Sequence, residues 1–219
     1  MNVKRLAILA AGVAAVALAG PAYAKKCPQD AVLVGRLCVD KYEASAWETT
    51  DTATIKNIKK GKVDAVSDLT LATQRGATSD DYGVACPDNG AGCVSVCAVS
   101  LPGVTPARYV TQIQATAACR NAGKRLLSNG EWTAAALGTP DPGTDNGTSD
   151  CNVGNTSVVA NTGSRSLCVS DSGAFDTVGN RWEWVADWGR CQRRARDGAG
   201  SATTLTAWRE RAPRAAPAR

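Results

Sequence analysis

The chain has 219 residues, a formal net charge of +5, nine cysteines, one methionine and no histidine. The lack of histidine excludes Ser-His-Asp and Cys-His catalysis, and it excludes His-ligated zinc and iron sites. Residues 190–219 hold eight arginines against Asp197 and Glu210, so the positive charge lies in this segment. The part before it is mildly acidic, and nothing in it indicates nucleic-acid binding.

Residues 1–24 have the pattern of a secretory signal peptide. Two basic residues precede an apolar run from Leu6 to Ala19, and Ala22-Tyr23-Ala24 is a small-residue cleavage site. The run is short for a membrane span, and the alternative is an uncleaved N-terminal anchor. We therefore expect a secreted or periplasmic chain that starts at Lys25 and has no membrane span after cleavage.

All nine cysteines follow the predicted signal peptide, which in an oxidising compartment indicates disulfides rather than metal ligands. Cys27 is expected to pair with Cys38 across a hairpin, and Cys151 with Cys168 across a loop. Four cysteines remain for two further bridges: Cys86, Cys93, Cys97 and Cys119. Cys191 is left without a partner.

The first predicted element is a β-hairpin within residues 25–45, because β-branched and apolar residues flank Gly35. Residues 47–81 are polar, with few large apolar side chains, and predict a long surface insertion with at most a short strand. Its clustered lysines are expected to form a solvated face: Lys56, Lys59, Lys60 and Lys62.

The first of two short helices is expected over Gln112 to Ala122. Ile113, Ala117 and Cys119 are predicted to face inward, and Gly123 supplies a left-handed stop.

The second helix is expected to open at Ser128, because Glu131 three residues later completes a capping box. Its predicted apolar face contains Trp132, Ala135 and Ala136. The following residues, 139–170, are rich in Asp, Asn, Gly and Thr but lack the ligand spacing of an EF-hand. They predict a disulfide-stapled surface loop, with a diffuse calcium-holding loop as the alternative.

Residues 173–188 hold three of the six tryptophans, interleaved with Glu183 and Asp187 after a Gly-Asn turn. This pattern is typical of a Trp-rich core strand after a tight turn. It also fits a loop that is pinned into the core by its rings and holds a cation with its oxygens.

Two stretches together resemble the formylglycine-generating enzyme family, also called sulfatase-modifying-factor-like. They are Gly123-Lys-Arg-Leu-Leu-Ser-Asn-Gly-Glu-Trp132 and Gly173-Ala-Phe-Asp-Thr-Val-Gly-Asn-Arg-Trp-Glu-Trp-Val-Ala-Asp-Trp188. Residues 38–43 and 105–115 are similar to two further family motifs, in the family's order. The resemblance implies an α+β, C-type-lectin-like fold over residues 25–189, with two short helices, small twisted sheets and much irregular chain around calcium.

The resemblance also implies a calcium site. Its ligands would be the carboxylates of Asp176 and Glu183 and the backbone carbonyls of Gly179 and Arg181. A second, weaker position would start at Asn152 and Val153. Two hard anionic donors around a Gly-Asn turn suit calcium, and the alternative is that backbone amides satisfy both carboxylates.

Catalytic members of the family bind Cu(I) through two cysteines well beyond this motif, and a soft ion needs two thiolates close together. This chain has only Cys191 after Trp188, and it lacks the family's C-terminal core motif. Copper is therefore not expected, and an iron-dependent sulfoxide synthase is excluded because its ligands are histidines.

These departures favour a non-catalytic binding or scaffold protein with a protein or glycan ligand. The alternative is a copper-dependent oxidase that converts a cysteine of a target protein to formylglycine, as in sulfatase maturation. The Arg/Ala-rich residues 190–219 are expected to be a disordered, altered ending of the family sequence. The alternative for them is a basic tail that binds acidic surfaces.

Overall fold

A computed structural model describes residues 26–154 and 158–187 of the chain. One compact unit ends at Asp187, and the second unit, Trp188–Arg219, lies outside the described residues together with the predicted signal peptide and Cys191. Across the described part of the chain, no helix has both the length and the apolarity needed to cross a bilayer.

The chain begins with the expected hairpin. Strand β1 (Ala31–Val34) pairs antiparallel with β2 (Leu37–Asp40), so that Val34 lies opposite Leu37. Gly35 has a φ of +59° in the two-residue turn, a conformation that costs glycine little. The Cys27–Cys38 disulfide joins the approach to β1 to β2, as the sequence predicted.

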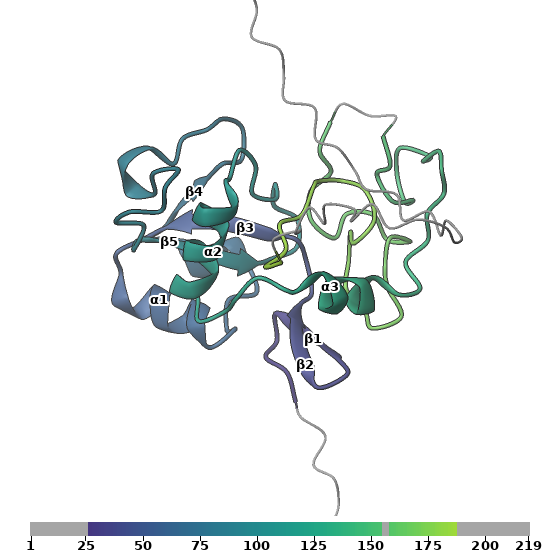
Figure 1. The fold of residues 1–219 in the computed structure, drawn as a ribbon, viewed down its shortest axis with the longest axis horizontal. Helices are drawn as coiled ribbons and strands as arrows, with labels where there is room; N and C mark the ends of the chain where they lie inside the picture. Colours follow the sequence, from purple (N-terminus) through teal and green to yellow (C-terminus); the bar gives the residue numbers. More distant parts are fainter. Residues whose placement is uncertain (1–25, 155–157, 188–219) are drawn as a thin grey trace, which may run out of the picture. The chain divides into compact units, whose positions relative to one another are not determined.

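A three-stranded antiparallel sheet forms the centre of the core, with β3 (Ala44–Glu48) between β4 (Thr73–Arg75) and β5 (Val96–Ser100). Every residue of β5 is buried, because helix α2 covers this strand (Figure 1). The apolar side chains of the core include Trp47, Val96, Val99 and Leu101. A strand buried on both faces lacks alternation, and the sequence pattern therefore did not reveal β5.

The surface insertion predicted for residues 47–81 is wrong. This region contributes the end of β3, helix α1 (Thr52–Lys59), a 3-10 turn, η1 (Val66–Leu69), and β4. Ile58, Val63 and Leu69 of this region are buried in the core, whereas Val66 and Leu71 are exposed.

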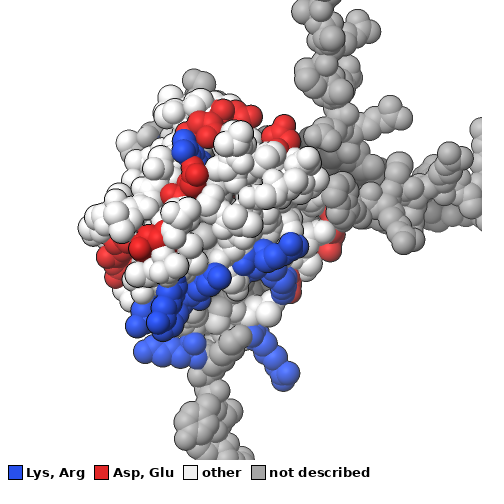
Figure 2. Space-filling model, turned by 90° about the vertical axis from the view of Figure 1, so that its left-hand side faces the viewer, with Lys and Arg blue, Asp and Glu red and all other residues white. Residues whose placement is uncertain are grey.

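The lysines of this region are exposed, as expected. Figure 2 shows basic side chains gathered on one face, beside a band of acidic ones. Lys56 and Lys59 lie on α1, and Lys60 and Lys62 follow directly after it.

Helix α2 (Gln112–Asn121) lies where it was expected, and Ala117 and Cys119 pack against the core as predicted, but Ile113 does not. Ile113 is 49% exposed, whereas Gln114 is 1% exposed. Gln114 completes a capping box with Thr111, and its amide donates to the carbonyl of Cys86 at 2.6 Å. A polar side chain fills this interior position because its hydrogen bonds are satisfied there. Gly123 ends the helix with a φ of +73°.

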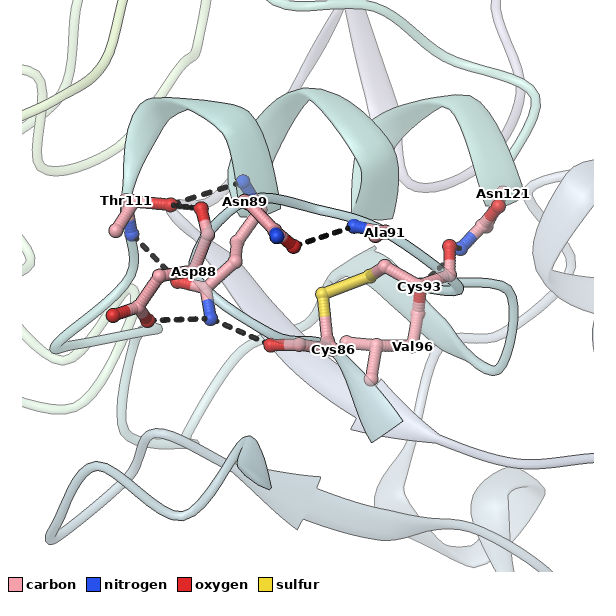
Figure 3. Close-up of a disulfide and its surroundings, with 9 residues drawn as sticks. Cys86, Asp88, Asn89, Ala91, Cys93, Val96, Thr111 and Asn121 are labelled. Carbon is pink, nitrogen blue, oxygen red and sulfur yellow. Dashed lines mark hydrogen bonds between the residues drawn. A yellow bond between two sulfur atoms is a disulfide. The ribbon is translucent and has the colours of Figure 1, made fainter. Parts of the chain in front are cut away.

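The loop closed by the Cys86–Cys93 disulfide is held against α2 (Figure 3). The Thr111 hydroxyl donates to the carbonyl of Asp88 at 3.0 Å. At the other end of the helix, the Asn121 amide donates to the carbonyls of Cys93 and Val96 at 2.9 and 2.8 Å. A short 3-10 turn, η2 (Gly83–Ala85), precedes this loop.

The predicted fourth disulfide is not formed. Cys97 lies inside β5 and Cys119 in the last turn of α2, and both are free thiols. Of the four cysteines expected to form two bridges, only Cys86 and Cys93 are bonded to each other. Sequence spacing alone could not show that Cys86 and Cys93 form a disulfide whereas Cys97 and Cys119 are free thiols packed like small apolar side chains.

Helix α3 (Asn129–Ala136) begins as predicted, since the Ser128 hydroxyl caps it and the Glu131 carboxylate accepts from the Ser128 amide at 2.8 Å. Arg125 forms a bidentate ion pair with Glu131. After α3 the chain is almost entirely loop, stapled by the Cys151–Cys168 disulfide. The described residues thus form a small α+β fold with three α-helices, two small sheets and three disulfides.

The cap of α3 generates a pH prediction. Hydrogen bonds from Arg125 and the Ser128 amide lower the pKa of Glu131 to about 2, so its charge stabilises the fold above its ordinary pKa of 4.5. That contribution is lost as pH falls toward 2. We expect Glu131→Gln, which keeps the cap acceptor, to lower the urea midpoint at pH 7, and the difference from wild type to close between pH 5 and 2.

Ser128→Ala is the matched control, because its hydroxyl does not titrate. It is expected to cost about 1 kcal/mol across the same pH range. A difference between Glu131→Gln and wild type that stays constant with pH would contradict the assigned role of the charge.

Candidate functional site: a cavity bordered by buried carboxylates

A cavity of about 690 Å³ lies among the hairpin, the central sheet, α2, α3 and the Trp-rich segment. Its wall is largely apolar, and it also contains charged residues from both ends of the described chain. Those charged residues are Asp30, Asp40, Glu43, Lys59, Lys124, Arg125, Arg181 and Glu183.

The Trp-rich segment forms no strand in the described residues. Trp182 is 94% exposed and lines the cavity, and Trp184 donates its indole N–H to the carbonyl of Val110 at 2.8 Å. The interpretation as a core strand is therefore wrong. The segment is a loop beside the cavity, which explains why its tryptophans alternate with polar residues.

The Gly-Asn turn is built from two consecutive residues with positive φ, +78° at Gly179 and +53° at Asn180. The carbonyl of Asn152 accepts from the Asn180 amide at 2.8 Å and lies so close to Gly179 that a Cβ atom there would collide with it. The Arg181 amide then donates to the Gly179 carbonyl at 2.7 Å and closes the turn. Glycine is therefore required at position 179.

The Asn180 side chain joins the turn to the rest of the domain. Its amide group donates to a carboxylate oxygen of Glu43 and to the carbonyl of Ala160, the latter at 3.1 Å. Its oxygen accepts from the Ala160 amide at 2.9 Å and from the Asn152 side chain at 3.0 Å. Sequence reasoning identified the turn but not this side chain.

Asp176 is buried beneath the turn and has a φ of +59°. Its carboxylate accepts from the Gly163 amide at 2.6 Å. Burial raises the pKa of Asp176, although the Gly163 N–H and the charge of Arg165 oppose the rise. The alternative to calcium binding was that backbone amides satisfy both carboxylates by hydrogen bonding. For Asp176 one such hydrogen bond, from Gly163, is present.

Two further carboxylates belong to the same cluster. Glu183 lines the cavity and is an exposed residue overall, but loss of hydration around its carboxylate and the charge of Asp176 raise its pKa to about 7. Glu43 is 9% exposed, and burial followed by the charge of Glu183 raises its pKa well above the ordinary value. One oxygen of Glu43, Oε1, has no hydrogen-bond partner.

Glu43 was not predicted as a site residue. It ends the stretch of residues 38–43 quoted above for the family resemblance, and this was the available signal. Glu43 directly precedes strand β3 and is far from the turn in the sequence, so only the folded sheet places its carboxylate beside Asn180.

The donor chemistry fits a hard cation at the turn. The charge of Asp176 contributes to the raised pKa of Glu183, so the two predicted carboxylate ligands interact electrostatically. Nowhere in residues 26–154 or 158–187 do three His, Cys, Asp or Glu side chains converge to hold a metal ion. An ion at the turn would therefore rest on two carboxylates and on backbone carbonyls, oxygen donors that calcium accepts.

Two of the carbonyl oxygens predicted as calcium ligands already accept hydrogen bonds. The Gly179 carbonyl accepts the Arg181 amide, and the Asn152 carbonyl accepts the Asn180 amide. The Gly179 oxygen keeps a second lone pair. Val153 packs beside Gly179.

Lys124 occupies another part of the wall, between two carboxylates. Its ammonium donates to Asp30 at 2.9 Å and to Asp40 at 2.7 Å. Burial opposes the charge, but Asp40 and Asp30 outweigh it and raise the pKa of Lys124. This triad fastens the hairpin to the connector between α2 and α3.

Comparison with known protein families defines the class of this chain. The profile of the sulfatase-modifying factor enzyme 1-like domain matches residues 11–210. The chain therefore belongs to the sulfatase-modifying-factor-like family, as its motifs indicated. No curated protein and no solved structure gave a significant match. The matched range includes the first part of the Arg/Ala-rich residues 190–219.

The Lys124 triad yields a stability prediction. Lys124→Met leaves two carboxylates facing each other without their cation, and we expect a loss of about 3 kcal/mol in the free energy of unfolding. Lys56→Met, on the exposed face of α1, is the control and is expected to change stability by less than about 0.5 kcal/mol. Equal effects of the two substitutions in urea unfolding would contradict the role of the triad.

Proposed function

We propose that this chain is a secreted or periplasmic, non-catalytic binding or scaffold member of the sulfatase-modifying-factor-like family. In this proposal its loops have the C-type-lectin-like arrangement around calcium, and its partner is a protein or a glycan. The observation that carries the non-catalytic role is the state of the free thiols.

Copper-dependent oxidation of a substrate cysteine requires two accessible thiolates that share one soft ion. The free thiols in the described part of the chain are Cys97 and Cys119, and the other cysteines there form disulfides. Cys97 is 1% exposed, and burial raises its pKa. Burial also raises the pKa of Cys119 to about 11. Both thiols are protonated at neutral pH, which disfavours copper ligation.

Secretion is supported by the signal-peptide pattern and by the disulfides, which persist in oxidising compartments. The three disulfides also stabilise a chain that is rich in loops, because they restrict the unfolded state.

The proposed calcium site uses the carboxylates of Asp176 and Glu183 with the carbonyls of Gly179 and Arg181. Asn152 and Val153 are the weaker candidates. When bound, the ion would neutralise Asp176 and Glu183, where loss of hydration and then the charge of Asp176 raise the pKa of Glu183. The residues of the turn would hold the Trp-rich loop in one position beside the cavity.

The alternative function is the copper-dependent oxidase that generates formylglycine, and family membership favours it. Cys191 lies outside the described residues, so a copper site there would have to combine it with one of the free thiols. The two functions differ in a measurable property, the presence of a bis-thiolate site.

Calcium binding is tested by thermal unfolding of the secreted chain with and without the ion. At a free calcium concentration of about a hundred times Kd, we expect stabilisation of roughly 2–3 kcal/mol. Asp176→Asn and Glu183→Gln are each expected to abolish this calcium-induced shift. Asp141→Asn, on an exposed loop, is the control that retains it. A shift of equal size in all four proteins would refute the site.

The redox role is tested by thiol counting and by Cu(I) titration against a competing chelator. Cys97 is expected to react with a thiol reagent only after unfolding, and Cys119, partly exposed on the cavity wall with a raised pKa, is expected to react slowly in the folded protein. The folded protein is expected to show no stoichiometric copper site. Variants Cys97→Ser, Cys119→Ser and Cys191→Ser complete the design. A tight site that two of these substitutions remove would establish the oxidase alternative.

A further inference from the structure

One face of the domain carries a cluster of lysines at the end of helix α1 (Figure 2). Lys56 and Lys59 lie in the last turn of α1, Lys60 is its C-cap and Lys62 follows, and all four are exposed. The ion pairs within the described residues involve other cations. The helix dipole favours the two lysines of the last turn, but it does not account for Lys62 beyond the helix end.

The end of helix α2 extends this positive surface. Gly123 lies against the stem of Lys59, because a Cβ atom on Gly123 would be 3.6 Å from the Lys59 Cγ. The Gly123 amide donates to the carbonyl of Arg120 at 3.0 Å, and Arg120 is exposed in the last turn of α2. The ends of the two helices therefore place Arg120 beside the lysines.

The first described residues extend the surface on the other side. Gly61 fits so closely against Pro28 and Asp30 that a Cβ atom on Gly61 would collide with both. The Gln29 side chain also donates to Asp64, the one carboxylate in residues 52–64. Lys26 is exposed and lies two residues before Pro28. We call the whole surface the lysine face: Lys26, Lys56, Lys59, Lys60, Lys62 and Arg120.

The composition of the lysine face decides between kinds of anionic partner. Protein interfaces are enriched in Trp, Tyr and Arg and depleted in Lys. The exposed aromatic residues of the described chain, Tyr109, Trp182 and Trp184, lie on other segments. A lysine has a compact ammonium on a long apolar stem, which suits the headgroup region of an anionic lipid surface.

The position of the chain's start favours a lipid surface over a soluble polyanion. Lys26 is the second residue after the predicted signal peptide, whose apolar run would enter the membrane during export. Because residues 28–30 pack against Gly61, the lysines lie next to the point at which the chain would leave the membrane.

We propose that the lysine face holds the secreted chain on a membrane surface rich in anionic phospholipid, where its ammonium groups pair with lipid phosphates. The face is a peripheral contact and needs no membrane span. It adds a location to the binding role proposed above, and it depends on neither calcium nor copper.

The test is co-sedimentation of the secreted chain with vesicles of phosphatidylcholine that contain about 30% phosphatidylglycerol. Vesicles of phosphatidylcholine alone are the control. We expect binding to the anionic vesicles only, and we expect it to be lost at about 0.5 M NaCl, because salt screens the attraction between exposed charges.

Variants assign the binding to the lysine face. The double change Lys59→Gln with Lys60→Gln is expected to lower the partition coefficient about 30-fold, at roughly fivefold per lysine. The matched change Lys59→Arg with Lys60→Arg keeps the charge and is expected to bind like wild type. Arg36→Gln removes one charge from the exposed hairpin turn and is expected to change binding by less than about twofold.

A lysine footprint separates this face from residues 190–219, which hold eight arginines and no lysine. Anionic vesicles are expected to protect Lys56, Lys59, Lys60 and Lys62 from reductive methylation. Lys41 is the internal control, because its ammonium lies over the rings of Tyr42 and Phe175, and it should keep its rate.

An unchanged partition coefficient in the double Gln variant, or unprotected lysines in the vesicle-bound chain, would assign the binding to residues 190–219 and overturn the proposal. Equal loss in the double Gln and double Arg variants would overturn the role of charge. Binding to dextran sulfate without binding to anionic vesicles would replace the lipid with a soluble polyanion. The calcium and copper tests above use other residues, so their outcomes are independent of these.

Discussion

The side chain of Asn180 links the Gly-Asn turn to three other segments of the domain. It bonds to Glu43 beside the central sheet, to both backbone groups of Ala160 and to the side chain of Asn152. These segments are up to 137 residues apart in the sequence. With Gly179 it also forms two successive left-handed residues, a conformation that few residue types accept. Asp176 and Glu183 lie on either side of this turn in the sequence, and the charge of Asp176 acts on Glu183.

The cost of this arrangement is the burial of two carboxylates, Glu43 and Asp176, and the charge of Asp176 acts on Glu43. Burial is the first cause of the raised pKa of Glu43, Asp176 and Glu183, and like charge adds to it at Glu43 and Glu183. A fold selected for stability alone gains little from such a cluster, because desolvation exceeds the attraction to Arg181 and Arg165. Perturbed carboxylates beside a cavity are typical of binding sites, which supports the proposal of a calcium ion at the turn.

The local elements could be predicted from the sequence because their signals are local. The hairpin turn at Gly35, the capping box at Ser128 and the stop at Gly123 each lie within a few residues, and each was predicted correctly. The interior was not predictable in the same way. Gln114 is buried because of a carbonyl 28 residues away, and Glu43 reaches the turn only through the sheet. Asp176 and Glu183 were inferred from family motifs. The third carboxylate, Glu43, could be recognised only from the tertiary structure.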